Sequence, residues 1–110
     1  MAVTHDGKEA PILPEEMNPD DIDTFYVSWT DKLNGATLSS DTWTLPTGFT
    51  QVSTVSDVSV VSNGITYLNS NGVTVSTSLT TGKHLLSNNA VFSDGREITR
   101  SLYVVLDANL

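Results

Sequence analysis

Histidine is the side chain most often used as a general base in hydrolysis, and this sequence contains two, His5 and His84. A serine hydrolase needs a nucleophile, a base and an orienting acid within hydrogen-bonding reach of one another. His5 lies in the polar N-terminal stretch, and His84 begins a predicted strand, where we expect an exposed or edge position. The sequence has neither the G-x-S-x-G nucleophile motif nor a cysteine. These patterns predict a protein that is not an enzyme.

Acidic residues provide the next candidates, as ligands for a cation or as a catalytic carboxylate pair. Asp20, Asp21 and Asp23 could offer oxygen ligands to Ca²⁺, but this cluster lacks the glycine and the distal glutamate of an EF-hand loop. The remaining carboxylates that could form a glycosidase-like pair are Asp57, Asp94, Glu97 and Asp107. They fall in predicted turns or at strand ends, where surface carboxylates are common. Gly82–Lys83 stands outside any G-x-x-x-x-G-K phosphate loop. We therefore expect no metal and no cofactor.

Two tryptophans mark the elements that would have to position any site. Phe25, Val27 and Trp29 alternate with polar or smaller residues, as Trp43 does in the run from Thr42 to Leu45. This period of two predicts strands with one apolar face. We expect Trp29 and Trp43 to be buried core residues with Val27, Leu102 and Val104 nearby, rather than an exposed binding platform.

Short alternating runs separated by turn residues continue from residue 23 to the end of the chain. Asn34–Gly35, Asn63–Gly64 and Asn71–Gly72 suit tight turns, and residues 93–96 suit a hairpin connection between the last two strands. About seven strands at this spacing predict an all-β fold, a small antiparallel β-sandwich of immunoglobulin-like type.

Charge is distributed unevenly along the chain. The net charge is −8, and residues 1–31 contribute eight acids and one lysine, a net charge of −7. A protein of this sign repels phosphate backbones and anionic lipid surfaces, so we expect neither nucleic acid nor membrane as a partner. A basic protein surface is the expected partner.

The first twenty residues differ from the rest, because they hold three of the four prolines and few apolar side chains. We predict an extended N-terminal arm over residues 1–20 and a sandwich domain over residues 21–110. The arm is expected to bind a neighbouring subunit, with apolar residues in a groove and acids near basic groups. The predicted partner-binding residues are Ile12, Leu13, Glu15, Glu16 and Met17.

Three blocks of sequence resemble a family of small structural proteins of tailed bacteriophages. Asn18–Trp29 resembles the family's Pro-Asp entry into an aromatic strand that ends in Trp, and Leu38–Thr50 resembles its Ser-x-x-Trp-x-x-Pro-x-Gly-Leu stretch. Ser93–Arg96 and Arg100–Leu102 are similar to its Gly-Arg hairpin and the strand after it. The chain departs from the family pattern at Phe49 and Ser28, and in the turn of the middle hairpin.

This resemblance implies an immunoglobulin-like virion protein without enzymatic activity, present in several symmetry-related copies. It would dock on capsid, neck, tail or fibre subunits, as a fibre-to-tail adaptor or as a capsid decoration protein. The alternative from a different class is a carbohydrate-binding or host-adhesion sandwich module. An exposed Trp29 or Trp43 would favour that alternative, because glycan-binding modules stack sugars on exposed aromatic rings.

Overall fold

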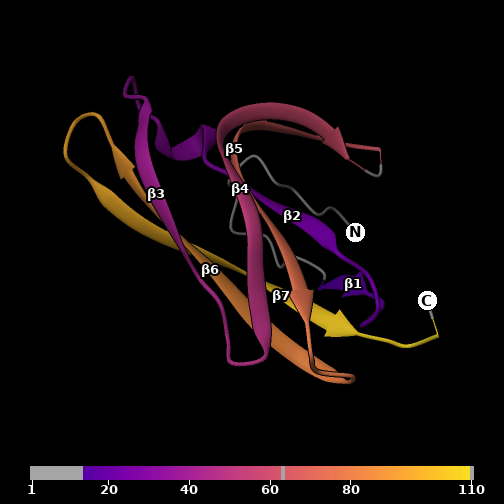
Figure 1. Ribbon diagram of the computed structural model, residues 1–110. Helices are drawn as coiled ribbons and strands as arrows, with labels where there is room; N and C mark the ends of the chain where they lie inside the picture. Colours follow the sequence, from indigo (N-terminus) through magenta and orange to yellow (C-terminus); the bar gives the residue numbers. More distant parts are fainter. Residues whose placement is uncertain (1–13, 63, 110) are drawn as a thin grey trace.

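A computed structural model describes residues 14–62 and 64–109 as two facing β-sheets (Figure 1). One sheet has the strand order β1-β7-β6-β3 and the other has the order β2-β5-β4. The strands are β1 (Glu15–Met17), β2 (Asp23–Ser28), β3 (Leu38–Thr44), β4 (Phe49–Ser62), β5 (Ile65–Thr77), β6 (Gly82–Phe92) and β7 (Glu97–Leu106). A single turn of 3₁₀ helix, η1 (Thr30–Lys32), follows β2.

The strand order is that of an immunoglobulin-like sandwich. In such domains the second, fifth and fourth strands share one sheet, and the third, sixth and seventh share the other. Here β2, β5 and β4 form the first group and β3, β6 and β7 form the second. The predicted all-β, immunoglobulin-like fold is confirmed. One pair departs from the antiparallel pattern, since β1 runs parallel to β7.

The apolar side chains that alternate along the strands point inward and fill the space between the sheets. Trp29 is fully buried and Trp43 is 8% exposed, as the sequence predicted. Val27, Leu102 and Val104 are buried with them, also as predicted. The other buried members of this core are Met17, Phe25, Phe49, Val73, Val75, Leu86, Ala90, Phe92 and Leu106.

The predicted turn at Asn71–Gly72 is wrong. Both residues are buried within β5, which runs unbroken through them and pairs with β2 on one side and β4 on the other. Gly72 is required there for close packing: a Cβ atom would lie 2.7 Å from the Tyr26 ring and 3.0 Å from Val55. The hairpin turn predicted at residues 93–96 is confirmed, with Gly95 at a φ of 92°.

The boundary predicted for the N-terminal arm also needs correction. Residues 15–17 form β1, and Met17, which is 1% exposed, belongs to the sandwich core. The backbone N–H of Asp107 donates to the carbonyl of Met17 over 3.0 Å. The sequence could not reveal this, because the pairing partner of these three residues lies about ninety positions away. Ile12 and Leu13 lie outside the described residues.

Two truncations test this boundary. Deleting residues 1–13 leaves β1 and its pairing with β7 in place, so we expect the melting temperature of the free protein to stay unchanged. Deleting residues 1–17 removes the buried Met17 side chain and the pairing of β1 with β7. That loss should lower the free energy of unfolding by about 2–3 kcal/mol. Urea denaturation of both truncated proteins measures the difference, and equal stability would show that β1 is dispensable.

Candidate functional site

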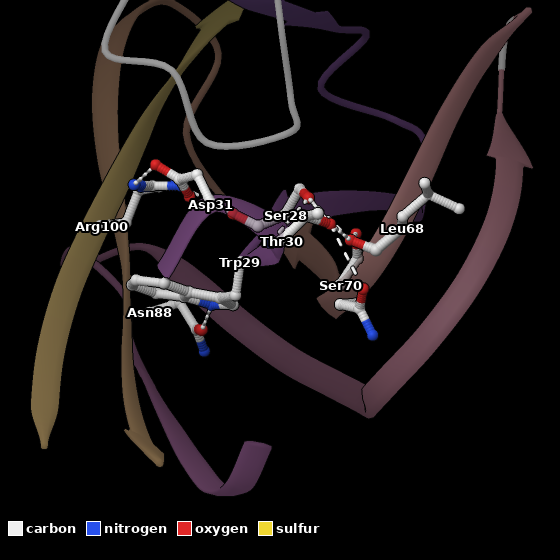
Figure 2. Close-up of polar contacts among 9 residues, drawn as sticks. Ser28, Trp29, Thr30, Asp31, Leu68, Ser70, Asn88 and Arg100 are labelled. Atoms are coloured by element: carbon white, nitrogen blue, oxygen red, sulfur yellow. Dashed lines mark hydrogen bonds and ion pairs between the residues drawn. The ribbon is translucent and has the colours of Figure 1, made fainter. Parts of the chain in front are cut away.

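A buried amide, Asn88 of β6, connects the two sheets at the centre of the sandwich. Trp29 Nε1 donates to Asn88 Oδ1 over 2.9 Å, and Asn71 Nδ2 of β5 donates to the same oxygen over 3.0 Å. Asn88 Nδ2 in turn donates to Asp41 Oδ2 of β3 over 2.8 Å. Figure 2 shows the indole of Trp29 directed at Asn88. These residues act as a structural link, because each one satisfies a polar group that the core would otherwise leave unpaired.

The same network fixes an irregularity in β4. Asp57 has a positive φ of 53°, and its backbone N–H donates to Asn71 Oδ1 over 3.0 Å. Next to it, the hydroxyl of Ser56 donates to Asp41 Oδ1. The pairing of β4 with β5 shifts register at this point. Asp57 therefore stabilises a bulge through its backbone N–H.

Arg96 and Arg100, from the hairpin motif and the last-strand motif, also stabilise the fold. Arg100 Nη1 donates to the Ser28 carbonyl over 2.8 Å and to Asp31 Oδ1 over 3.1 Å, and its guanidinium lies 4.8 Å from the Trp29 ring centre (Figure 2). Arg96 donates to the Leu33 carbonyl over 2.8 Å. The motifs thus place side chains that close one end of the sandwich.

Three hydroxyl groups gather on a single backbone carbonyl, that of Leu68 in β5. Ser28 Oγ donates over 2.6 Å, Thr30 Oγ1 over 3.0 Å and Ser70 Oγ over 3.1 Å (Figure 2). A nucleophilic serine needs an adjacent base. His84 instead contacts the Thr81 carbonyl, with Nε2 at 2.9 Å, and its ring lies 5.4 Å from that of Phe49. The structure does not assemble these hydroxyls with His84 into a hydrolytic site, and His5 lies outside the described residues.

The acidic residues considered as metal ligands do not converge. Asp20 and Asp21 are exposed, and Asp23 Oδ1 accepts a hydrogen bond from the Thr24 backbone over 2.8 Å. Within residues 14–62 and 64–109, no group of three or more acidic or histidine side chains is placed to hold a metal ion. The other carboxylates are dispersed: Asp94 pairs with Arg96 in the last hairpin, and Asp107 follows β7.

Glu15, one of the predicted partner-binding residues, is half-buried at the start of β1. Burial raises the pKa of its carboxyl, and the nearby carboxylate of Asp23 raises it further. Tyr67 lies in the same region, and burial together with the charge of Glu15 raises the pKa of its phenol to about 12. Folding therefore disfavours the ionised form of Glu15, the form that would pair with a basic partner.

This environment predicts a pH-dependent effect of Glu15→Gln. A carboxyl whose pKa is raised by folding destabilises the protein once the pH exceeds the unfolded pKa, since its charged form is disfavoured in the fold. The variant should be more stable than the parent at pH 7, and the advantage should disappear as the pH falls below the ordinary value of 4.5. Thermal melts across this pH range measure it. Glu16→Gln, on the exposed side of β1, is the matched control.

The sequence-based predictions did not include the most exposed apolar side chains on the sheet that contains β7. Leu85 of β6 is 43% exposed and Tyr103 of β7 is 45% exposed, and they are direct partners in the strand register. The Lys83 ammonium lies 4.6 Å from the Tyr103 ring centre. The alternation that buries Leu86 and Leu102 predicts that their neighbours face outward, so this signal was available in the sequence.

The comparisons with known proteins identify no family for this chain. No protein-family model matches the sequence, and no curated protein matches it. Among solved structures, the chain is similar to the solution structure of the PKD domain from KIAA 1837 protein, with a TM-score of 0.46 and 13% sequence identity. That match covers 97% of this chain and 90% of the other. The part of the chain that is described contains no helix long and apolar enough to cross a membrane.

Proposed function

We propose that this chain is a non-enzymatic structural protein of a bacteriophage virion, which docks on another virion protein through its N-terminal segment. The observation that carries the proposal is the attachment of β1 to β7. Besides the strand pairing, Asn18 Nδ2 donates to the Ala108 carbonyl over 3.4 Å. These contacts fix residues 15–18, which follow the N-terminal segment in the sequence, to the end of the chain's last strand.

Thirteen residues precede Pro14, the first residue that the structure describes. Fully extended, such a length spans at most about 45 Å, enough to cross part of a neighbouring subunit. It carries the adjacent apolar residues Ile12 and Leu13, and its acids Asp6 and Glu9 outnumber Lys8. A partner with an apolar groove bordered by basic residues fits this chemistry.

The set of docking residues is therefore smaller than the sequence alone indicated. Met17 is withdrawn because it is a core residue, and Glu15 is withdrawn because it is half-buried. Glu16 is exposed on the outer side of β1. Ile12 and Leu13 remain as the proposed anchors. The phage resemblance supports the virion assignment, either as an adaptor that seats fibres at the neck or tail or as a capsid decoration protein.

No specific contact favours a carbohydrate-binding module as a second candidate. Both tryptophans are buried, so neither forms an exposed platform for a sugar ring. The exposed ring of Tyr103 has the Lys83 ammonium over it.

Quantitative mass spectrometry of purified virions tests the proposal. In phage complemented with the full chain, the protein should be found in fixed stoichiometry with other virion proteins, and deletion of residues 1–13 should lower its occupancy strongly. Ile12→Asp combined with Leu13→Asp should reproduce the loss. Val3→Asp, which adds a charge to the same segment, is the control and should retain occupancy. Absence of the full chain from virions would refute the virion assignment, and wild-type occupancy of the deletion would refute docking through this segment.

A further inference from the structure

The outer face of the four-stranded sheet carries an apolar centre on β6 and β7. Leu86, Leu102, Val104 and Leu106 are buried against the core, so the residues between them face outward. The outward set is Leu85, Tyr103 and Val105, and we call it the β7 face. Leu85 and Tyr103 are 43% and 45% exposed, and they lie directly opposite each other in the register. Paired exposed apolar side chains on a rigid sheet are typical of a protein contact.

Two opposite charges lie on either side of this centre. Lys83 of β6 and Glu16 of β1 are both opposite Val105 of β7, so the three residues form one row across the outer side of the sheet. Neighbouring strands are about 4.8 Å apart, which places the Cα atoms of Lys83 and Glu16 on opposite sides of β7, about 10 Å from each other. Within the described residues the ammonium of Lys83 contacts the Tyr103 ring and forms no ion pair.

We propose that the β7 face binds the same face of a second copy of this chain. A twofold axis that runs along β7, between the two faces, places β6 of each copy against β1 of the other. Lys83 of one copy then lies opposite Glu16 of the second copy, and the symmetry forms this ion pair twice. Tyr103 and Val105 of the two copies meet at the axis, with strands aligned as in packed sheets.

The charge pattern favours a second copy of this chain over a partner whose contacting residues carry charges of only one sign. A purely basic partner would place its cations against Lys83, and a purely acidic one would meet Glu16. The row through Val105 carries one charge of each sign, and the twofold rotation places Lys83 of each copy opposite Glu16 of the other. The proposed pairing concerns the free protein, so it does not depend on docking to a virion.

Sedimentation velocity of the full chain over a concentration series tests the dimer. Physiological ionic strength is used because its Debye length of about 8 Å screens the repulsion between two copies that each carry a net charge of −8. The expected result is a concentration-dependent shift from monomer to dimer. Tyr103→Glu should abolish the shift and leave the melting temperature of the monomer unchanged. Val61→Glu is the matched control, at a 70% exposed valine on the other sheet, and should still form the dimer.

Exchange of the two charges distinguishes this geometry from non-specific association. Lys83→Glu and Glu16→Lys should each raise the dissociation constant of the dimer about tenfold, since each variant places like charges opposite each other at two symmetric positions. The variant that carries both substitutions should recover the wild-type constant. A monomer at every concentration, equal loss in the Val61→Glu control, or a double variant no better than the single ones would each overturn the proposal.

Discussion

Replacing Trp29 with alanine is expected to lower the free energy of unfolding by about 3–5 kcal/mol, a large part of the about 5–15 kcal/mol that stabilises a typical small domain. The indole is fully buried, and its ring makes an edge contact with Phe92 at 5.7 Å. Its N–H donates to Asn88, and the Arg100 guanidinium lies over its ring. The substitution leaves a cavity, removes one of the two donors to Asn88 Oδ1 and removes the ring beneath the Arg100 guanidinium. Urea denaturation followed by circular dichroism measures the change.

The second tryptophan provides a matched comparison. Trp43 is also buried, but its indole N–H has no hydrogen-bond partner among the described residues. Trp29→Phe should therefore cost more than Trp43→Phe, because only the first substitution removes a buried hydrogen bond and leaves Asn88 with one donor fewer. The net contribution of one hydrogen bond to the free energy of unfolding is about 1 kcal/mol, so the two costs should differ by about that amount. Equal costs would show that the bond between Trp29 and Asn88 contributes nothing.

Replacing Asn88 with leucine should also destabilise the protein severely, by about 3 kcal/mol or more. The side chain is fully buried and joins Trp29, Asn71 and Asp41. Its loss leaves two N–H donors and one carboxylate oxygen without their partner, and each unsatisfied buried group costs about 1–3 kcal/mol. The branched leucine fills a similar volume, so the measured loss reports mainly the polar network.

Asn88→Asp tests the direction of the central hydrogen bond. The new carboxyl can accept from Trp29 and Asn71 but can donate to Asp41 only while protonated, so folding should raise its pKa. The variant should then be most stable at acidic pH and lose stability as the pH rises above about 4, the ordinary value for aspartate. Asn89→Asp, at a residue that bonds Thr99 on the outer face, is the control. A variant at position 88 that is as stable at pH 7 as the control would contradict the network.

Local sequence patterns determined the architecture of this protein to a large extent. Alternation identified the apolar face of each main strand, and it correctly placed Trp29 and Trp43 in the core. Gly95 was correctly assigned to a turn, since its positive φ is a local requirement that glycine meets without strain. Burial of a strand face and the geometry of a tight turn depend on residues close in the chain, so the sequence shows them directly.

Contacts between distant residues decided the remainder. Asn71–Gly72 has the local form of a turn, yet the Tyr26 ring from β2 and Asn88 from β6 require those two residues in the middle of a strand. Met17 lies in a proline-rich acidic stretch and is buried only because β7, about ninety residues later, offers it an edge. The row of Lys83, Val105 and Glu16 likewise exists only once three strands are aligned. Composition and spacing cannot encode such pairings, because their energy arises only when the sheets have packed.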